Sequence, residues 1–196
     1  NPVRPEIAAL AAPAGRFAGR DGALHLLVIG GSLGAQALNE AVPQAMALLG
    51  GNEQPQIVHQ AGEKHLDALV ANYAAVGVQA HCVSFIEDMA GAYEWADLVI
   101  CRAGALTIAE LAAAGVASIL VPFPHAVDDH QSGNAKFLVH AGGAFLLPQS
   151  DMTPDAIALI RNYSRGQLLE MAEKARSLAK PDATEEVANI CAEIAK

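Results

Sequence analysis

Short apolar runs alternate with stretches of helical spacing along most of this sequence, and this alternation constrains the fold more than any other feature. Each run of four to seven apolar residues is followed by a turn signal and then by apolar residues spaced as on one face of a helix. Runs such as 26–29 and 98–100 lack the period of two that a half-exposed strand shows, as expected where helices cover both faces of a sheet. The sequence therefore predicts the α/β class, with a Rossmann-like, doubly wound parallel sheet.

The same pattern gives the order of the elements. About six strands are predicted, at residues 24–29, 56–60, 81–85, 98–101, 118–121 and 145–147. Helices are predicted to follow the first four of them, the first reaching residue 49 and the others covering 63–76, 89–95 and 106–114. After Pro148 only helices are predicted, over 154–163, 166–179 and 183–195.

The expected domain organisation is one domain with an additional segment at each end. Residues 1–20 are expected to be a linker and domain entry, because residues before prolines such as Pro2 and Pro5 avoid the α region. Residues 21–180 are expected to form the Rossmann-like domain, and residues 181–196 a C-terminal helix that packs toward another domain. Because the chain begins with Asn rather than Met and shows no signal peptide, we interpret it as a piece of a longer protein.

Charge and cysteine usage argue against several classes of function. The chain has 12 Lys and Arg against 21 Asp and Glu, a formal net charge of −9, which disfavours nucleic-acid binding and docking on an acidic membrane surface. The longest uncharged stretch, residues 111–127, is interrupted by glycine and prolines and does not predict a membrane span. Cys82, Cys101 and Cys191 are odd in number and far apart, so no disulfide framework or paired-cysteine metal site is expected, and a reducing, cytoplasmic setting fits best.

The turn after the first predicted strand is rich in glycine and reads Gly-Gly-Ser-Leu-Gly-Ala over 30–35. Its spacing matches neither a dinucleotide fingerprint nor a P-loop, and the second strand ends in His59-Gln60 without an acidic residue, which disfavours NAD and ATP. In a doubly wound sheet, ligands bind beyond the carboxyl ends of the strands. Two interpretations remain open: the turn at Gly31 brings Ser32 to a phosphate oxygen, or it serves only the close packing of strand and helix.

The segment after the fourth strand, Cys-Arg-Ala-Gly-Ala-Leu-Thr-Ile-Ala-Glu over 101–110, predicts an anion site at a helix start. Gly104 would allow a sharp turn, and the amides of Ala105, Leu106 and Thr107 would face a diphosphate. Thr107 and Glu110 also fit a capping box, which is the structural alternative. Glu110 lies among Ile, Leu and Ala, where a carboxylate needs a partner, and a ribose diol is one candidate.

The loop after the third strand offers a place for a flat base. Phe85, Ile86 and Met89 combine backbone groups with apolar side chains. The alternative is an ordinary loop in which Asp88 caps the following helix.

Polar residues also follow the fifth strand. The pair Asp128-Asp129 suggests a metal site, but the preferred interpretation is that one of them is the N-cap of the next helix. His130, Gln131 and Asn134 are expected on the first helical turn, facing the cleft. Side-chain amides suit sugar hydroxyls because each offers a donor and an acceptor.

Taken together, these segments resemble a known family. Asn-Pro-Val-Arg at 1–4, the turn at 30–35, Phe-Ile-Glu-Asp-Met at 85–89, the segment 101–110 and the Val-Pro-Phe…Asp-Asp-His-Gln…Asn pattern over 121–134 are similar to MurG sequences. That family comprises bacterial GlcNAc transferases that convert lipid I to lipid II in peptidoglycan synthesis. The resemblance covers essentially the whole chain, in order, as the C-terminal, donor-binding half of a GT-B enzyme.

The resemblance implies UDP-GlcNAc as the donor and assigns a role to each motif. Ile86 would meet uracil through its backbone, Glu110 would hold the ribose hydroxyls, and Ser32 with the amides at 105–107 would face the diphosphate and stabilise the departing UDP. Gln131 and Asn134 would contact the GlcNAc. The full set of implied substrate-binding residues is Arg4, Gly31, Ser32, Phe85, Ile86, Met89, Arg102, Gly104, Ala105, Leu106, Thr107, Glu110, His130, Gln131 and Asn134. Two positions depart from the family pattern, Leu33 and His130, where glutamines occur in some members.

The resemblance also implies what lies elsewhere. No cofactor or metal is expected, and the general base, the lipid I site and the membrane-facing surface would belong to the other half, so this chain would bind the donor without turnover. The full-length protein would be peripheral on the cytoplasmic face of the inner membrane. Two alternatives remain: a stand-alone nucleotide-sugar-binding subunit that needs a membrane-bound partner, and a UDP-GlcNAc epimerase of similar fold.

Overall fold

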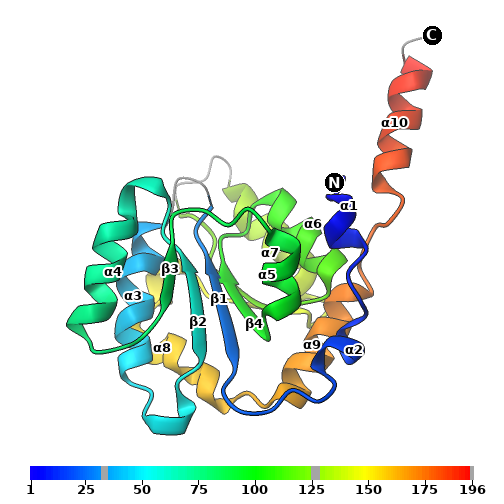
Figure 1. The fold of residues 1–196 in the computed structure, drawn as a ribbon. Coiled ribbons are helices and arrows are strands. Elements are labelled where there is room, and N and C mark those ends of the chain that lie inside the picture. Colours follow the sequence, from blue (N-terminus) through cyan, green and yellow to red (C-terminus); the bar gives the residue numbers. More distant parts are fainter. Residues whose placement is uncertain (32–34, 125–128, 195–196) are drawn as a thin grey trace.

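A six-stranded parallel sheet forms the centre of the domain (Figure 1). The computed structural model describes residues 1–31, 35–124 and 129–194, and within them the strands lie in the order β3-β2-β1-β4-β5-β6. Their bounds are β1 His25–Ile29, β2 Gln56–Gln60, β3 His81–Val83, β4 Leu98–Cys101, β5 Ala117–Leu120 and β6 Ala144–Leu146. Each bound lies within two residues of its prediction. The predicted α/β class and doubly wound parallel sheet are confirmed.

Helices connect the strands and cover the sheet. They are α1 Pro5–Ala8, α2 Pro13–Phe17, α3 Gln36–Ala47, α4 Leu66–Ala75, α5 Met89–Trp95, α6 Ala105–Ala114, α7 His130–Val139, α8 Pro154–Ala158, α9 Arg165–Arg176 and α10 Ala183–Ile194, with short 3₁₀ turns at η1 Gly51–Glu53, η2 Glu63–His65, η4 Gln149–Asp151 and η5 Leu159–Asn162. The single helix predicted over 154–163 is thus split into α8 and η5, and the one predicted from residue 63 begins as η2.

Both faces of the sheet are buried, which explains the unbroken apolar runs. Leu26 and Val28 pack with α3, α4, α8 and α9 in one core cluster. Leu27 and Ile29 point the other way and pack with α1, α5, α6 and α7 in a second cluster. Figure 1 shows α3 and α4 on one side of the strands and α5 and α6 on the other. A strand covered on both faces has no polar side, so its sequence cannot alternate.

The direction of chain progression reverses at β1. This strand pairs with β2 on one side and with β4 on the other, and every pairing in the sheet is parallel. A crevice therefore opens beyond the carboxyl ends of β1 and β4, where doubly wound sheets bind ligands.

The first residues depart from the extended conformation expected of them. Helix α1 begins at Pro5 and α2 at Pro13, each with its proline at the start of the helix. Proline is favoured there because its missing N–H would have no partner inside the helix and its fixed φ already suits the first turn. Ile7 and Phe17 are buried in the core clusters. The prolines thus begin helices that pack on the domain.

Helix α10 extends away from the rest of the domain (Figure 1). Of its described residues, Ala183 is buried and the others are exposed. No helix within residues 1–31, 35–124 and 129–194 has the length and apolar character to cross a membrane.

Candidate functional site

A cleft of about 660 Å³ opens at the carboxyl ends of β1 and β4. Its walls come from the residues after β1, from the start of α3, from the residues after β4 and from the loop after β5. The lining residues are Ile29, Gly30, Gly31, Ala35, Gln36, Ala37, Glu40, Cys101, Arg102, Gly104, Thr107, Phe123, Gln131 and Gln149. The cleft thus lies where strand order reverses, as the sequence predicted for a ligand site.

The two glycine turns at this cleft differ in their backbone requirements. Gly31 has φ of +82°, in the left-handed region that favours glycine. Gly104 has φ of −64° and ψ of 145°, an extended conformation open to any residue, so the turn into α6 does not require glycine at this position. A side chain at either position would meet no described atom closer than Thr107 Oγ1, 3.6 Å from a Cβ on Gly104. Ser32 and Leu33, also assigned to this region, lie outside the described residues.

Gly104 and Thr107, at the start of α6, line the cleft. Gly104 is the N-cap, and no side chain of the described residues caps the first amides, those of Ala105, Leu106 and Thr107. Thr107 is the third residue of the helix rather than its cap, so the capping-box interpretation of Thr107 and Glu110 is wrong. Uncapped amides at a helix start carry partial positive charge and can bind an anion.

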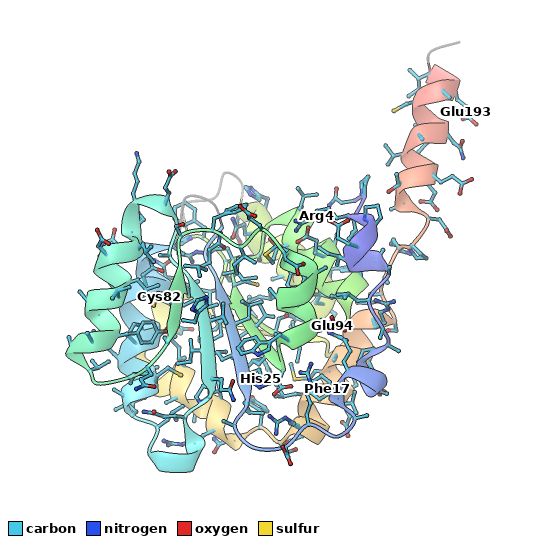
Figure 2. The ribbon with its side chains drawn as sticks, in the orientation of Figure 1. Arg4, Phe17, His25, Cys82, Glu94 and Glu193 are labelled. Atoms are coloured by element: carbon cyan, nitrogen blue, oxygen red, sulfur yellow. The ribbon has the colours of Figure 1, made fainter. Side chains whose placement is uncertain are left out.

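The Glu110 carboxylate has protein partners on both oxygens. Arg4 donates from Nε and Nη2 to Oε1, at 3.1 and 2.8 Å, and Tyr93 donates from Oη to Oε2 at 3.1 Å. The Glu110 side chain is 16% exposed and that of Arg4 is 43% exposed. Figure 2 shows Arg4 at the carboxyl end of the sheet, with Phe17 and His25 at the opposite end. The partner that the sequence demanded for this carboxylate is therefore supplied in part by the first residues of the chain.

The loop after β3 places an exposed aromatic beside half-buried aliphatic side chains. Phe85 is 59% exposed, whereas Ile86 and Met89 pack against the core cluster that holds α5 and α6. Asp88 is the N-cap of α5, where Oδ1 accepts from the amide of Gly91 at 2.8 Å, as the alternative interpretation of this loop predicted.

The amide side chains on α7 hold the neighbouring loops together. Gln131 Oε1 accepts from the amides of Ala103, at 3.2 Å, and Phe123, at 2.9 Å, and so ties the loop after β4 to the loop after β5. Asn134 donates to the carbonyl of Ala103 at 3.1 Å. Because Gln131 Oε1 already accepts from two backbone amides, the side chain has its NH₂ left to offer as a donor at the cleft.

The other described polar residues at the start of α7 do not line this cleft. Asn134 lines a second, smaller cavity of about 350 Å³ between α6 and α7. His130 is exposed at the start of α7. Asp129 is the N-cap residue of α7, but its Oδ1 accepts from the Ser132 hydroxyl at 2.6 Å rather than from a backbone amide. Asp128 lies outside the described residues.

The sequence from residue 25 to residue 193 matches the glycosyltransferase family 28 C-terminal domain. The chain belongs to this family.

The proteins that are similar to this chain are longer than the chain itself. A protein of Dechloromonas aromatica (strain RCB) is named UDP-N-acetylglucosamine–N-acetylmuramyl-(pentapeptide) pyrophosphoryl-undecaprenol N-acetylglucosamine transferase and is 89% identical over 196 residues, 100% of this chain and 56% of that protein. The crystal structure of Acinetobacter baumannii MurG matches with a TM-score of 0.87 at 45% identity, over 94% of this chain and 54% of that chain. CalG4, the calicheamicin glycosyltransferase, shares the fold alone, with a TM-score of 0.62 at 18% identity over 100% of this chain and 48% of that chain. The family 28 chain thus spans about half the length of these proteins.

Arg102 supports the wall of the cleft in this family 28 domain. It donates to the carbonyls of Val121 and Pro122, each at 3.2 Å, and to Gln149 Oε1 at 2.6 Å. Its guanidinium also lies over the Phe123 ring, 5.4 Å from the centroid. Burial lowers the pKa of Arg102, but a guanidinium remains charged at neutral pH. The side chain therefore places a cation at the wall of the cleft while joining the loop after β5 to η4.

Tyr93 and Gln149 contribute to the site without a sequence signal, and Asn1 belongs to the motif at 1–4 but had no role assigned. They contact Glu110, Arg102 and the Ala105 carbonyl respectively. Each lies far along the chain from its partner, so only the fold brings the pairs together. Buried Cys101 also lines the cleft, and burial raises the pKa of its thiol to about 12, which leaves it protonated and unreactive. Within the described residues, no three His, Cys, Asp or Glu side chains are grouped as metal ligands.

Proposed function

We propose that this chain is the donor-binding half of an inverting glycosyltransferase that transfers GlcNAc from UDP-GlcNAc to lipid I. The observation that carries the proposal is the uncapped start of α6, which opens on the cleft at the strand-order reversal. The name of the Dechloromonas aromatica relative supports the choice of donor and acceptor. The general base and the lipid I site would lie in the part of the enzyme outside this chain.

The chemistry suits a protein of net charge −9. The net charge of such a chain gives a diphosphate no long-range attraction, so local peptide dipoles would contribute much of its binding. As the glycosidic bond breaks, negative charge grows on the leaving UDP, and the amides of Ala105, Leu106 and Thr107 would stabilise it without reorganising. Ser32, through its hydroxyl, and the turn at Gly31 would hold the diphosphate from the β1 side. Arg102 adds a fixed positive charge at the wall of the cleft.

The remaining donor contacts are proposed from the resemblance to the MurG family. Uracil would lie against the loop at Phe85, Ile86 and Met89, and the ribose would bind Glu110 beside Arg4. The GlcNAc would accept from the amide NH₂ of Gln131. His130 and Asn134 would contribute at the edge of the sugar site.

Helix α10 has exposed apolar side chains that suit a contact with another part of a longer protein. Val187, Ile190 and Ile194 follow helical spacing and are exposed. We propose that this face packs on another part of the full-length protein, which would be cytoplasmic and peripheral on the inner membrane. Membrane contact would not be made through this domain.

We expect UDP to protect the chain from thermal unfolding, because a ligand that binds only the folded state stabilises it by mass action. At one hundred times its dissociation constant, UDP should add about 2.7 kcal/mol and raise the melting temperature by about 5 to 10 °C. Scanning calorimetry measures the shift, with ADP and TDP as ligands that share the diphosphate. Millimolar UDP without a shift would contradict the proposal, and equal shifts for ADP and UDP would contradict the uracil site.

Glu110→Gln should weaken UDP binding about tenfold or more, since a hydrogen bond from a ribose hydroxyl to a carboxylate is stronger than one to a neutral amide. Titration calorimetry on folded protein gives the affinity. Glu6→Gln is the matched control, because Glu6 is an exposed carboxylate on the neighbouring α1. Unchanged affinity in Glu110→Gln would remove Glu110 from the site.

The epimerase alternative makes a different prediction. An epimerase would convert UDP-GlcNAc to UDP-ManNAc, whereas a donor-binding half should bind UDP-GlcNAc and return it unchanged. Chromatography of the nucleotide sugars after incubation with this chain separates the two. Formation of UDP-ManNAc would replace the transferase proposal.

A further inference from the structure

Tyr93 connects the core of the domain to the Glu110 carboxylate. It lies on α5, is 1% exposed, and packs in the core cluster between the sheet and the helices α1, α5 and α6. Its hydroxyl is the one polar atom of its ring, and it donates to Glu110 Oε2 at 3.1 Å. No sequence motif includes this residue.

The two partners of Glu110 are not equivalent. Arg4 reaches Oε1 with a side chain that is 43% exposed, where water competes for the ion pair. Tyr93 reaches Oε2 from a side chain that is 1% exposed, so packing around the ring sets the geometry of this hydrogen bond. The orientation of the carboxylate therefore depends on the phenol more than on the guanidinium.

The backbone of Tyr93 is itself held in place. Buried Arg16 donates from Nη1 to the Tyr93 carbonyl at 3.0 Å and from Nη2 to the Ala114 carbonyl at 2.7 Å. These bonds join the end of α5 to the end of α6, the helix that carries Glu110. The phenol and the carboxylate thus sit on two helices linked by a third, buried group.

We propose that Tyr93 is a positioning residue, which orients the Glu110 carboxylate so that the remaining lone pair of Oε2 meets a hydroxyl of a nucleoside ribose. This inference rests on the proposed UDP site. Each carboxylate oxygen accepts about two hydrogen bonds, and Arg4 already gives two to Oε1 while Tyr93 gives one to Oε2, so one acceptor position remains, on Oε2, for a ribose hydroxyl. Burial and the nearby carboxylate raise the pKa of Tyr93 well above its usual value, which keeps the phenol protonated as a donor.

The test is Tyr93→Phe, which removes the hydroxyl and keeps the ring. Titration calorimetry with UDP, 2′-deoxy-UDP and 3′-deoxy-UDP gives the preference for the ribose hydroxyls. We expect the wild-type protein to prefer UDP by at least about tenfold over one deoxy analogue, because a site built for a hydroxyl rejects the ligand that lacks it. In Tyr93→Phe that preference should fall by about threefold to tenfold.

Tyr73→Phe is the matched control. Tyr73 is equally buried, and its hydroxyl bonds to His59 on the opposite face of the sheet from Glu110. Its loss should lower stability but leave the ribose preference of the folded protein unchanged. The titrations of both variants are repeated in trimethylamine N-oxide. This osmolyte favours the folded state, so a variant of lower stability remains folded during the titration.

The possible outcomes distinguish failure of the positioning role of Tyr93 from failure of the proposed UDP site. Absence of UDP binding to the wild-type protein overturns the proposed function, and equal affinity for all three ligands overturns the ribose role of Glu110 together with this inference. A full ribose preference in Tyr93→Phe overturns the positioning role alone. A loss of preference in both Tyr93→Phe and Tyr73→Phe also overturns it, because the effect would then follow from general loosening of the core.

Discussion

Replacing Asp97 with Asn should lower the free energy of unfolding by about 3 to 5 kcal/mol, because it removes the anion from a buried ion-pair network. The Asp97 side chain is fully buried. Its Oδ1 lies 2.6 Å from Arg20 Nη1, and its Oδ2 accepts from Arg165 Nε at 3.1 Å and from the His25 amide at 3.0 Å. The carboxylate thus joins the segment after α2, the start of β1 and the start of α9.

Urea denaturation of wild type and Asp97→Asn measures this loss, with Asp21→Asn as the control. Asp21 is an exposed carboxylate in the same part of the chain, and its replacement should change stability by less than about 0.5 kcal/mol. Asp97 directly precedes β4 and so lies at the end of the sheet opposite the cleft. UDP affinity per folded molecule should therefore be unchanged, and a loss below about 1 kcal/mol would show that the two arginines find other partners.

Much of the fold could be predicted because burial on both faces of a sheet leaves a strong sequence signal. The runs at 26–29 and 98–100 are apolar throughout, and each became a central strand. Strand order left no such signal, since the residues of β1 pack equally well beside β2 or β4. The helices α1 and α2 were missed because a proline at the first position of a helix and a proline in an extended linker give the same local pattern.

The backbone features of the candidate site could be predicted from the sequence, whereas most of its side-chain contacts could not. The uncapped start of α6 follows from local sequence, because glycine before a helix offers no side chain to cap it. The partners of Glu110 do not, since Arg4 is 106 residues away and Tyr93 is 17 residues away on another helix. The apolar surroundings of Glu110 in the sequence predicted that its carboxylate needs a partner, but the only candidate partner that we could name was a ligand. Gln131 shows the same limit, because its oxygen bonds two loop amides that only the fold brings near α7.

Acidification should destabilise this protein through His59, which is fully buried in the core. Its Nδ1 lies 2.9 Å from Tyr73 Oη, and its Nε2 lies 3.1 Å from Asn39 Oδ1. Asn39 donates its own NH₂ to the Ala61 carbonyl at 3.0 Å, so its oxygen must accept from Nε2. The hydrogen-bond network therefore assigns the proton to Nε2 and the acceptor role to Nδ1. A second proton, on Nδ1, would displace the hydrogen bond that the Tyr73 hydroxyl donates there and would place a charge in a core where, among the described residues, the ring has no carboxylate partner.

Burial lowers the pKa of His59 from 6.5 to about 3 in the folded protein. Above pH 6.5 both states are neutral and stability is complete. Between pH 6.5 and about 3 the unfolded chain binds a proton that the folded protein excludes. The free energy of unfolding therefore falls by about 1.4 kcal/mol per pH unit, and the total loss over this interval is about 5 kcal/mol. From pH 7 to pH 5, urea denaturation of the wild type should therefore show a loss about 2 kcal/mol greater than that of His59→Gln, whose neutral amide cannot take up the proton. Parallel curves for the two proteins over this range would mean that the folded core accepts a charged imidazole, and the buried network at Asn39 and Tyr73 would then have to rearrange to solvate it.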